Sequence, residues 1–335
     1  MPTPQEATNG QVALVAGASR GLGLLVAREL GRRGYRVVIC AREVEELDAA
    51  RAKLHAEGLM VESMVCDVAD NGEVTSMVSR IEATLGPIEV LVTVAGVIQV
   101  GPLQSLEREH FEQAVNIMLW GPVNLALAVV DSMRERGRGH IATVSSIGGM
   151  ISVPHLLPYG TAKFGAVGFS QGLRAEMSGT GVKVTTVVPG LMRTGSHLRA
   201  EFTGNQPAEY GWFSVGASFP LVSIDAERAA RQIVRRVLEG RALVVLTPLA
   251  KLAIRVHGLA PATTANLLGV LGRMLPGAPG SEQGTVTGHE ARDRLPGPAQ
   301  KVLDAITVLG RRAAGRFNEV GEKDGAAPMP GDGGA

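Results

Sequence analysis

The sequence predicts an α/β protein: a doubly wound parallel sheet of about seven strands, followed by a helical C-terminal extension. Over residues 1–247, short apolar runs alternate with longer segments of helical periodicity. The runs are almost continuously hydrophobic, which is typical of strands covered on both faces. Such alternation indicates βαβ units, whose right-handed crossovers bring the carboxyl ends of the strands to one edge. Ligands bind at that edge in sheets of this kind.

The predicted elements follow one another in a regular order. The strands are the β-rich apolar runs 12–17, 36–40, 60–68, 88–96, 139–146, 182–190 and 242–247. The helices are the intervening segments 21–33, 43–57, 72–85, 106–135, 158–178 and 225–239. Together they form a catalytic or binding domain over residues 1–247.

Residues 191–221 interrupt this order. The segment follows a strand end and mixes glycine, proline and aromatic residues, and loops of this length are usually functional or disordered. We predict that it is a substrate lid. Its aromatic residues favour an apolar substrate and an apolar lid core equally; they are Phe202, Tyr210, Trp212, Phe213 and Phe219.

The extension covers residues 248–319. Its sequence predicts one or two apolar helices over 248–275, a loop over 276–297 and a late amphipathic helix after that loop. Residues 320–335, rich in glycine, proline and charged residues, are predicted to be a disordered tail.

Composition narrows the functional class. The chain has 33 basic and 32 acidic residues, so bulk charge does not indicate a nucleic-acid partner. Its two cysteines, Cys40 and Cys66, give no disulfide framework and are expected to be buried thiols in a reducing cytosol. The N-terminus has no signal-peptide pattern, and no uninterrupted apolar run reaches about 18 residues. We expect a cytoplasmic protein without a metal site.

A tyrosine and a lysine stand one helical turn apart in the stretch "PYGTAKFG". The chain has only three tyrosines, and Tyr159 and Lys163 share a helix face because they are four residues apart. A nearby cation favours the phenolate and lowers the tyrosine pKa, which would suit proton transfer near neutral pH. Alone, the pair is more often an ordinary aromatic residue beside a solvated lysine.

A glycine-rich turn follows the first predicted strand. The stretch "AGASRGLG" places Gly17, Gly21 and Gly23 at the start of a predicted helix. Glycines there permit a tight turn and close approach to a pyrophosphate, and the helix offers its N–H groups to the phosphates. The spacing differs from the usual G-x-G-x-x-G, but its position favours nucleotide binding over a plain turn.

These motifs, with the A-G turn after the fourth strand, a serine before Y-x-x-x-K and a late P-G, resemble the short-chain dehydrogenase/reductase family. The match covers roughly residues 11–247, and the ordered set of motifs is highly specific. The resemblance implies a Rossmann-like fold and an enzyme that uses a nicotinamide cofactor to interconvert a carbonyl compound and an alcohol.

The resemblance also implies catalytic roles. Tyr159 would be the general acid, and Lys163 would lower its pKa and hold the nicotinamide ribose. Ser146 would donate a hydrogen bond to the substrate oxygen. Ser145 is the second candidate, since strand alternation directs it to the opposite face. Asn116, in "AVNIMLWG", would hold a water that connects Lys163 to solvent.

The resemblance favours NADP(H) over NAD(H). An NAD site normally has a carboxylate at the end of the second strand, where this chain has Ala41 followed by Arg42. Two guanidinium groups, those of Arg42 and Arg20, suit a 2′-phosphate. Asp67 would lie near the adenine ring, and Thr194 would contact the carboxamide. The full predicted cofactor set is Gly17, Ser19, Arg20, Gly21, Leu22, Gly23, Arg42, Asp67, Val68, Ala95, Gly96, Tyr159, Lys163, Pro189, Gly190 and Thr194.

Two positions depart from the family pattern. Ala16 replaces the usual threonine before the first glycine, and "TVAG" from Thr93 replaces N-N-A-G. The family's polar residues brace each other, so losing both can be nearly neutral. The departures raise the question of what keeps the turn near the nicotinamide rigid.

The substrate class stays open at this point, and so do two alternative hypotheses for the function. A sterol, a fatty or polyketide ketone, a retinoid-like aldehyde or a xenobiotic ketone would all fit. The first rival is a non-catalytic NADPH-binding regulator on the same fold. The second is a membrane-peripheral lipid or sterol reductase anchored by 248–275, where Lys251, Arg255 and Arg273 interrupt the apolar face.

We favour an enzyme whose residues 248–275 pack on the core or at a subunit interface. We expect this segment to lie beside the lid and form one wall of the substrate pocket. The expected assembly is a homodimer or homotetramer that acts on a small carbonyl or alcohol substrate.

Overall fold

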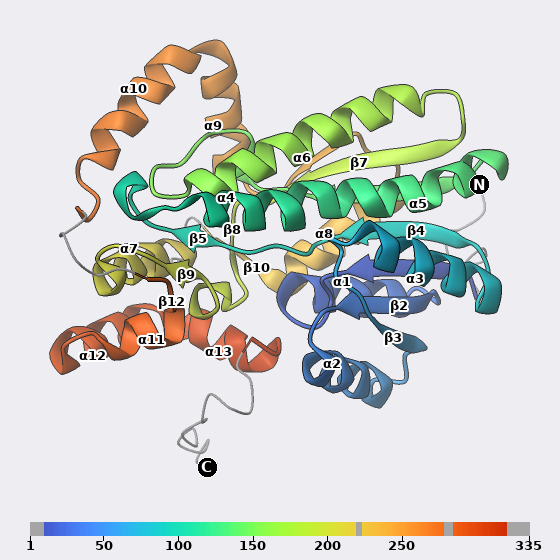
Figure 1. Ribbon diagram of the computed structural model, residues 1–335, viewed down its shortest axis with the longest axis horizontal. Helices are drawn as coiled ribbons and strands as arrows, with labels where there is room; N and C mark the ends of the chain where they lie inside the picture. Colours follow the sequence, from blue (N-terminus) through green and yellow to red (C-terminus); the bar gives the residue numbers. More distant parts are fainter. Residues whose placement is uncertain (1–9, 219–222, 278–283, 320–335) are drawn as a thin grey trace.

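A seven-stranded, entirely parallel sheet forms the centre of the computed structural model (Figure 1). The structure describes residues 10–218, 223–277 and 284–319. The strand order is β3-β2-β1-β4-β6-β7-β11. From β1 the chain first builds the sheet toward β3 and then, starting with β4, on the other side of β1. The strands are β1 (Val12–Ala16), β2 (Arg36–Ala41), β3 (Val61–Val65), β4 (Ile88–Thr93), β6 (Gly139–Val144), β7 (Val182–Val188) and β11 (Leu243–Val245). The predicted fold class is confirmed.

Helices cover both faces of this sheet. One apolar core joins the sheet to α1 (Gly21–Gly31), α2 (Val44–Ala56) and α8 (Ala226–Leu238). The other joins it to α3 (Asn71–Thr84), α5 (Gly121–Glu135) and α6 (Leu157–Glu176). Cys40 and Cys66 are buried free thiols in the second core, as predicted.

The helix predicted over 106–135 has an irregular centre. It consists of α4 (Arg108–Val115), a π-helical turn (Asn116–Trp120) and α5. The stretch Arg108–Glu135 is long and apolar enough to cross a membrane by composition, but 56% of its most apolar window is buried inside the protein. It is therefore explained as a core helix. π-turns of this kind are frequent at functional sites.

The predicted lid is folded rather than a structureless loop. It contains β8 (Leu191–Arg193), a 3-10 turn (Ser196–Leu198), β9 (Glu201–Phe202) and α7 (Gln206–Ser218), and β10 (Ser223–Asp225) pairs with β8. Phe202 packs on Tyr210 and Phe213 with ring centroids 5.6 and 5.9 Å apart. These aromatic residues form a lid core, because α7 places Tyr210 and Phe213 on one face. Phe219 lies outside the described residues.

The extension differs from its prediction in two ways. Within 276–297, where a loop was predicted, the chain forms β12 (Val286–Thr287) and α11 (Gly288–Asp293). The late helix is broken at Thr307 into α12 (Gly297–Ile306) and α13 (Val308–Arg316). β12 joins β9 and β5 (Gln99–Val100) in a small sheet, so the extension is tied to the lid. The predicted tail, 320–335, lies outside the described residues.

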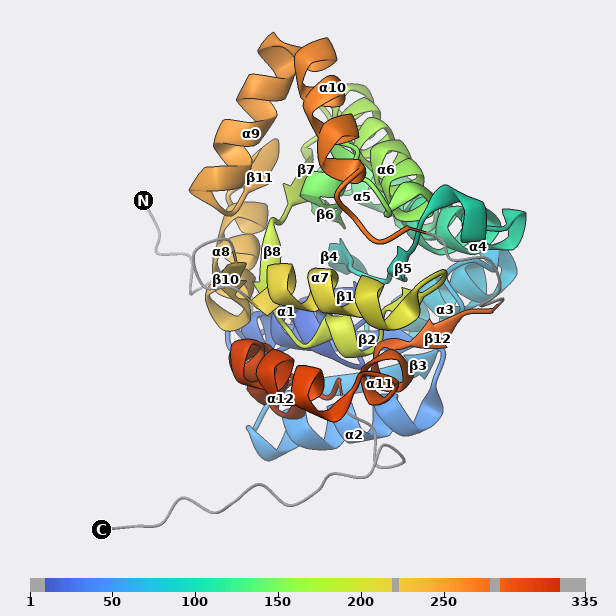
Figure 2. The same ribbon diagram turned by 90° about the vertical axis from the view of Figure 1, so that its left-hand side faces the viewer.

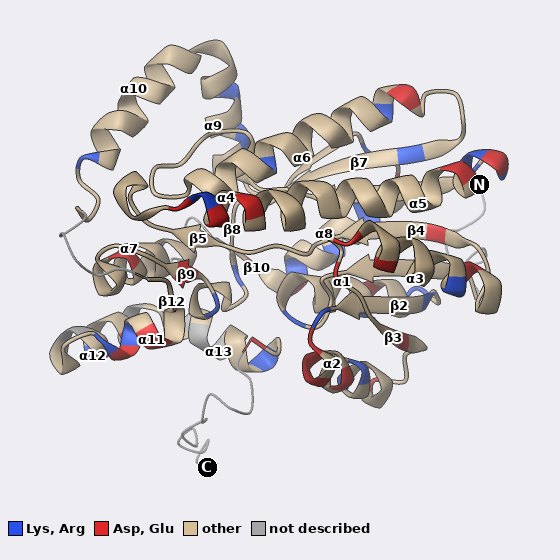
Figure 3. Cartoon of the chain, in the orientation of Figure 1, with Lys and Arg blue, Asp and Glu red and all other residues tan. Residues whose placement is uncertain are grey.

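The two apolar helices predicted over 248–275 are present but do not pack on the lid. α9 (Pro248–Leu259) and α10 (Pro261–Gly272) form a hairpin that projects from the body (Figure 2). The helices that pack on α7 are α11, α12 and α13. The α9–α10 hairpin carries basic but no acidic side chains (Figure 3). Its exposed apolar side chains are Leu249, Leu252, Val256, Leu259, Leu267, Val270 and Leu271. The expected homodimer or homotetramer stays a prediction.

Candidate active site

A cavity of about 340 Å³ opens at the carboxyl edge of the central sheet. Every residue of the predicted cofactor set lines it, and so does Ser146. Apart from Tyr159 and Lys163 of α6, the set follows the ends of β1, β2, β3, β4 and β7, which the parallel topology brings together. The structure thus gathers these residues in one place; their binding of a cofactor stays a prediction.

The glycine turn packs directly on the turn after β4. Gly17 has φ +79°, and a Cβ there would lie 2.4 Å from the Ala95 nitrogen. The carbonyl oxygen of Ala16 accepts hydrogen bonds from the N–H groups of Val94 (2.8 Å) and Ala95 (3.0 Å). Backbone hydrogen bonds therefore brace this turn in place of the family's polar side chains. The result is a bare backbone cradle that suits a dinucleotide.

Tyr159 sits in the first turn of α6, just after a proline that starts the helix. Its side chain is partly buried, and its phenol is hydrogen-bonded to Ser146. Burial raises the pKa of Tyr159, and the Ser146 hydrogen bond lowers it by a smaller amount. The pKa of Tyr159 therefore lies above its usual value rather than below it, because loss of hydration has the largest effect, and the lowering expected from Lys163 stays a prediction.

Lys163 lies one turn further along α6 and is buried with its charge. Its Nζ donates to the carbonyl oxygen of Val144 at 2.9 Å and lies 5.8 Å from the centre of the Tyr159 ring. Burial lowers the pKa of Lys163 to about 8. An ammonium group has three N–H donors, so beside its bond to Val144 it has donor capacity left for another acceptor. The predicted ribose hydroxyls would suit that capacity.

The two serines after β6 have different partners. Ser146 meets the phenol and also accepts from the Gly148 N–H at 3.1 Å. The Ser145 hydroxyl donates to the carbonyl oxygen of Lys163 at 3.0 Å and fastens α6 to the strand. The ranking of Ser146 before Ser145 agrees with this geometry.

Asn116 begins the π-turn, and its carbonyl oxygen accepts from the Gly121 N–H. Gln113 and Ile117, its helix neighbours, line the cavity, whereas Asn116 is not among the lining residues. Lys163 bonds to Val144 rather than to Asn116. The predicted water relay therefore stays a prediction.

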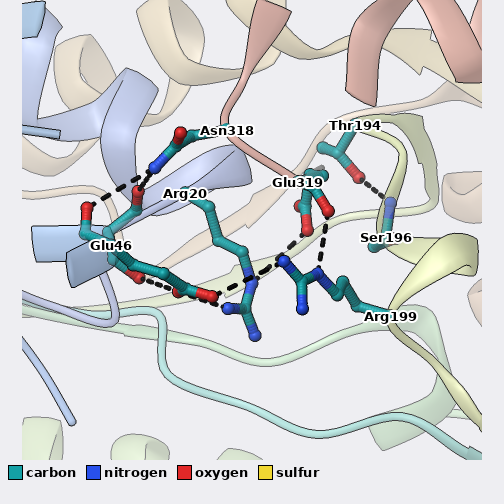
Figure 4. Close-up of polar contacts among 8 residues, drawn as sticks. Arg20, Glu46, Thr194, Ser196, Arg199, Asn318 and Glu319 are labelled. Carbon is teal, nitrogen blue, oxygen red and sulfur yellow. Dashed lines mark hydrogen bonds and ion pairs between the residues drawn. The ribbon is translucent and has the colours of Figure 1, made fainter. Parts of the chain in front are cut away.

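The ribose end of the cavity holds charges of both signs. Ala41, at the end of β2, and the exposed Arg42 line it, and the next residue, Glu43, is the first carboxylate after the strand. Arg20 pairs with Glu46 of α2 at 2.5 Å, and the Ser19 hydroxyl donates to the same carboxylate at 3.1 Å (Figure 4). Glu46 was not predicted from the sequence. Its place in an otherwise ordinary helix gave no indication of this contact.

A second cavity, of about 390 Å³, lies between the turn before α6 and the α9–α10 hairpin. Its lining is mainly apolar and includes Leu103, Val153, Pro154, Leu157 and Leu268. The hairpin therefore forms a wall of this cavity, although it does not pack on the lid.

His155 also lines the second cavity and was missed from the sequence. Its Nδ1 lies 2.8 Å from the Glu209 carboxylate, which is fully buried in α7. Trp212 donates to the same carboxylate at 2.6 Å. His155 has φ +62°, an uncommon conformation for a residue with a side chain. These contacts link the lid to the turn that precedes α6 and Tyr159.

No group of three or more His, Cys, Asp or Glu side chains that could hold a metal ion is present in the described part of the chain.

Comparison with known proteins adds to this geometry. Residues 11–202 match the family model described as short chain dehydrogenase. The chain is 33% identical over 186 residues to gluconate 5-dehydrogenase of Gluconobacter oxydans, which covers 56% of this chain and 73% of that protein. It is 35% identical over 189 residues to a glycine betaine reductase of Emericella nidulans, but spans only 15% of that longer protein.

Solved structures show the same fold. A variant of the actinorhodin polyketide ketoreductase, crystallised with NADPH, superimposes with a TM-score of 0.63 at 28% identity. The alignment covers 73% of this chain and 97% of that one. The uncovered part of this chain corresponds in size to its C-terminal extension.

Proposed function

Because the chain belongs to the short-chain dehydrogenase family, we propose that it is an NADP(H)-dependent oxidoreductase that interconverts a ketone or aldehyde and the corresponding alcohol. The observation that carries this proposal is the group of Ser146, Tyr159 and the buried Lys163, which line one cavity with the glycine cradle. A partly buried tyrosine beside a serine hydroxyl, in the cavity that the predicted cofactor residues line, suits proton transfer to a carbonyl oxygen.

The side chains divide the work at that oxygen. The hydroxyl groups of Ser146 and Tyr159 both donate toward it, and Tyr159 releases its proton as negative charge develops there. Lys163, held by the Val144 carbonyl oxygen, keeps a positive charge near the phenol as it becomes phenolate. The nicotinamide, when bound, supplies or accepts the hydride. Because burial raises the pKa of Tyr159, the phenol is protonated at neutral pH and can donate its proton in carbonyl reduction.

The charges at the ribose end support NADP(H) over NAD(H). The end of β2 offers Ala41 and Arg42 where an NAD site has a carboxylate. Arg42 is exposed at the cavity rim and is positioned to meet a 2′-phosphate. The similar polyketide ketoreductase structure contains NADPH.

The second cavity supports an apolar substrate. The relatives named above act, by name, on compounds as different as gluconate and a polyketide, so the cavity lining must decide the class. Five of its eleven lining residues are leucine, valine or proline, and its polar members are Ser152, His155 and His257. We propose a ketone or aldehyde attached to an apolar body.

Initial-rate measurements test the proposal. NADPH oxidation is followed with a panel of ketones and aldehydes of increasing apolar size, for the wild type and for Tyr159→Phe. The variant should keep NADPH binding, because it loses one hydroxyl and little volume, and lose about 10²–10⁴-fold in kcat. Near-normal turnover by the variant would refute the role of Tyr159. NADPH binding by the wild type without turnover of any compound would favour a regulator.

A further inference from the structure

The end of the described chain returns to the glycine turn. After α13, the carbonyl oxygen of Phe317 accepts a hydrogen bond from the Gly21 N–H at 2.8 Å. The side-chain amide of Asn318 donates to the carbonyl oxygen of Ser19 at 2.9 Å (Figure 4). These contacts join segments about 300 positions apart in the sequence, and both are made to the loop that should hold the cofactor phosphates.

Glu319 completes this contact with a buried carboxylate. The side chain is 6% exposed, and its Oε2 lies 3.4 Å from Nε of Arg20. Its backbone carbonyl oxygen accepts from Nε of Arg199 at 2.8 Å, and Arg199 also lies 3.7 Å from Glu46 (Figure 4). Two arginines thus hold Glu319 against the start of α1.

The open side of Gly21 faces this carboxylate. A Cβ on Gly21 would lie 2.4 Å from Oε1 of Glu319, and Gly21 has φ +55°. In dinucleotide sites a glycine at this point lets the backbone approach the pyrophosphate, and the helix N-terminus attracts its charge. The carboxyl group of Glu319 occupies the space in front of the same helix end. It would exclude a diphosphate from this place by its volume, with or without a proton.

We propose that residues Phe317–Glu319, here called the C-terminal plug, compete with the cofactor's phosphates for the glycine turn, so that the cofactor binds after the plug has left. This inference rests on the proposed function, since it assumes a dinucleotide ligand. The apparent cofactor affinity then equals the intrinsic affinity multiplied by the fraction of molecules in which the plug is open. The chain would thereby limit its own activity.

The plug should respond to pH. Burial raises the pKa of Glu319 to about 7; Arg20 and Arg199 lower it, and Glu46 raises it further, but burial has the largest effect. The plugged state therefore binds a proton that the open state, with an ordinary carboxyl group, has already released. Between the ordinary carboxyl range and pH 7, a rise in pH favours opening. Cofactor competition should be stronger at pH 6 than at pH 8.

Cofactor affinity in full-length variants tests the plug. The Kd of NADPH is measured by fluorescence at pH 6 and pH 8 for the wild type, Glu319→Ala and Asn318→Ala. Glu135→Ala, an exposed change of the same charge in α5, is the control. Both plug variants should bind NADPH about tenfold tighter than the wild type at pH 6, within the usual range of coupling between sites. For Glu319→Ala the increase in NADPH affinity over the wild type should be smaller at pH 8. Variant and wild type are compared at the same pH, so that protonation of the cofactor itself affects both equally.

Hydrogen exchange on the wild type gives a readout that needs no variant. NADPH should increase exchange in residues 313–319, because the plug leaves its contacts when the cofactor binds. Increased protection of this segment, or weaker NADPH binding in the plug variants, would show a clamp over bound cofactor and overturn the inference. Equal affinity of the wild type and both variants would also overturn it. Failure of every variant and the wild type to bind NADPH or NADH would overturn the proposed function as well.

Discussion

Replacement of the buried Lys163 by methionine should make the protein more stable and inactive. Lys163 is fully enclosed, and burial lowers its pKa from 10.5 to about 8. Since one pKa unit corresponds to 1.36 kcal/mol, the burial of this charge costs about 3 kcal/mol at neutral pH. Methionine has a similar length and no charge. After subtraction of about 1 kcal/mol for the lost hydrogen bond to Val144, Lys163→Met should gain about 2 kcal/mol at pH 7.

The gain should disappear at high pH. Because the folded-state pKa of Lys163 is depressed, the unfolded chain binds more protons between pH 8 and about 10.5. Below pH 8 the buried charge lowers the stability of the wild type. The wild type therefore recovers this stability as the pH rises through this range. The methionine variant has no such dependence. Its advantage over the wild type should shrink steadily above pH 8.

Urea unfolding at pH 7 and pH 9.5, followed by circular dichroism, measures this difference. Lys301→Met, at an exposed position in α12, is the control and should change stability little at either pH. A Lys163→Met protein that is less stable than the wild type by the same amount at both pH values would refute the reasoning. Loss of turnover in a more stable variant would mark Lys163 as a residue kept for function at the expense of stability.

Three further predictions follow from the site and the extension. Ala41→Asp combined with Arg42→Asp should lower the NADPH/NADH ratio of kcat/KM at least tenfold, because carboxylates repel the 2′-phosphate and accept from a free ribose hydroxyl; an unchanged ratio would direct attention to Arg20. Gly17→Ala should lower the melting temperature and abolish cofactor binding, since the added Cβ would meet backbone at 2.4 Å and φ is +79°; an unchanged melting curve contradicts this. Truncation after Thr247 should give an aggregating protein, because α11–α13 cover the aromatic lid core; a soluble truncation with an unchanged KM would show that the extension is dispensable.

Features that depend on local sequence could be predicted. The strands and the glycine turn are encoded in short runs of residues, and the parallel topology then brings every predicted cofactor residue to one cavity. The order of Ser146 and Ser145 followed from strand alternation. Helix α7 was missed because glycine, proline and aromatic residues lower helix propensity, whereas tertiary packing of Tyr210 and Phe213 stabilises the helix.

Features that depend on distant contacts could not be predicted. The direction of the Tyr159 pKa was wrong, because the sequence shows the neighbouring charge but not the depth of burial. Glu319 gave no indication of its place at Gly21, since no local pattern relates a residue near the C-terminus to the first turn of the sheet. The α9–α10 hairpin was predicted as two helices, but its separation from the lid depends on how α11–α13 fill that position.

Isotope transfer tests the central claim most directly. A ketone that the wild type reduces is incubated with NADPH carrying deuterium at C4 of the nicotinamide, and the alcohol is analysed by mass spectrometry. The account predicts one deuterium per alcohol in the wild-type product and about 10²–10⁴-fold less product from Tyr159→Phe at equal NADPH occupancy. Alcohol without deuterium, whichever of the two C4 hydrogens of NADPH is replaced, would contradict hydride transfer. Equal product from both proteins would contradict the role of Tyr159 as the proton donor.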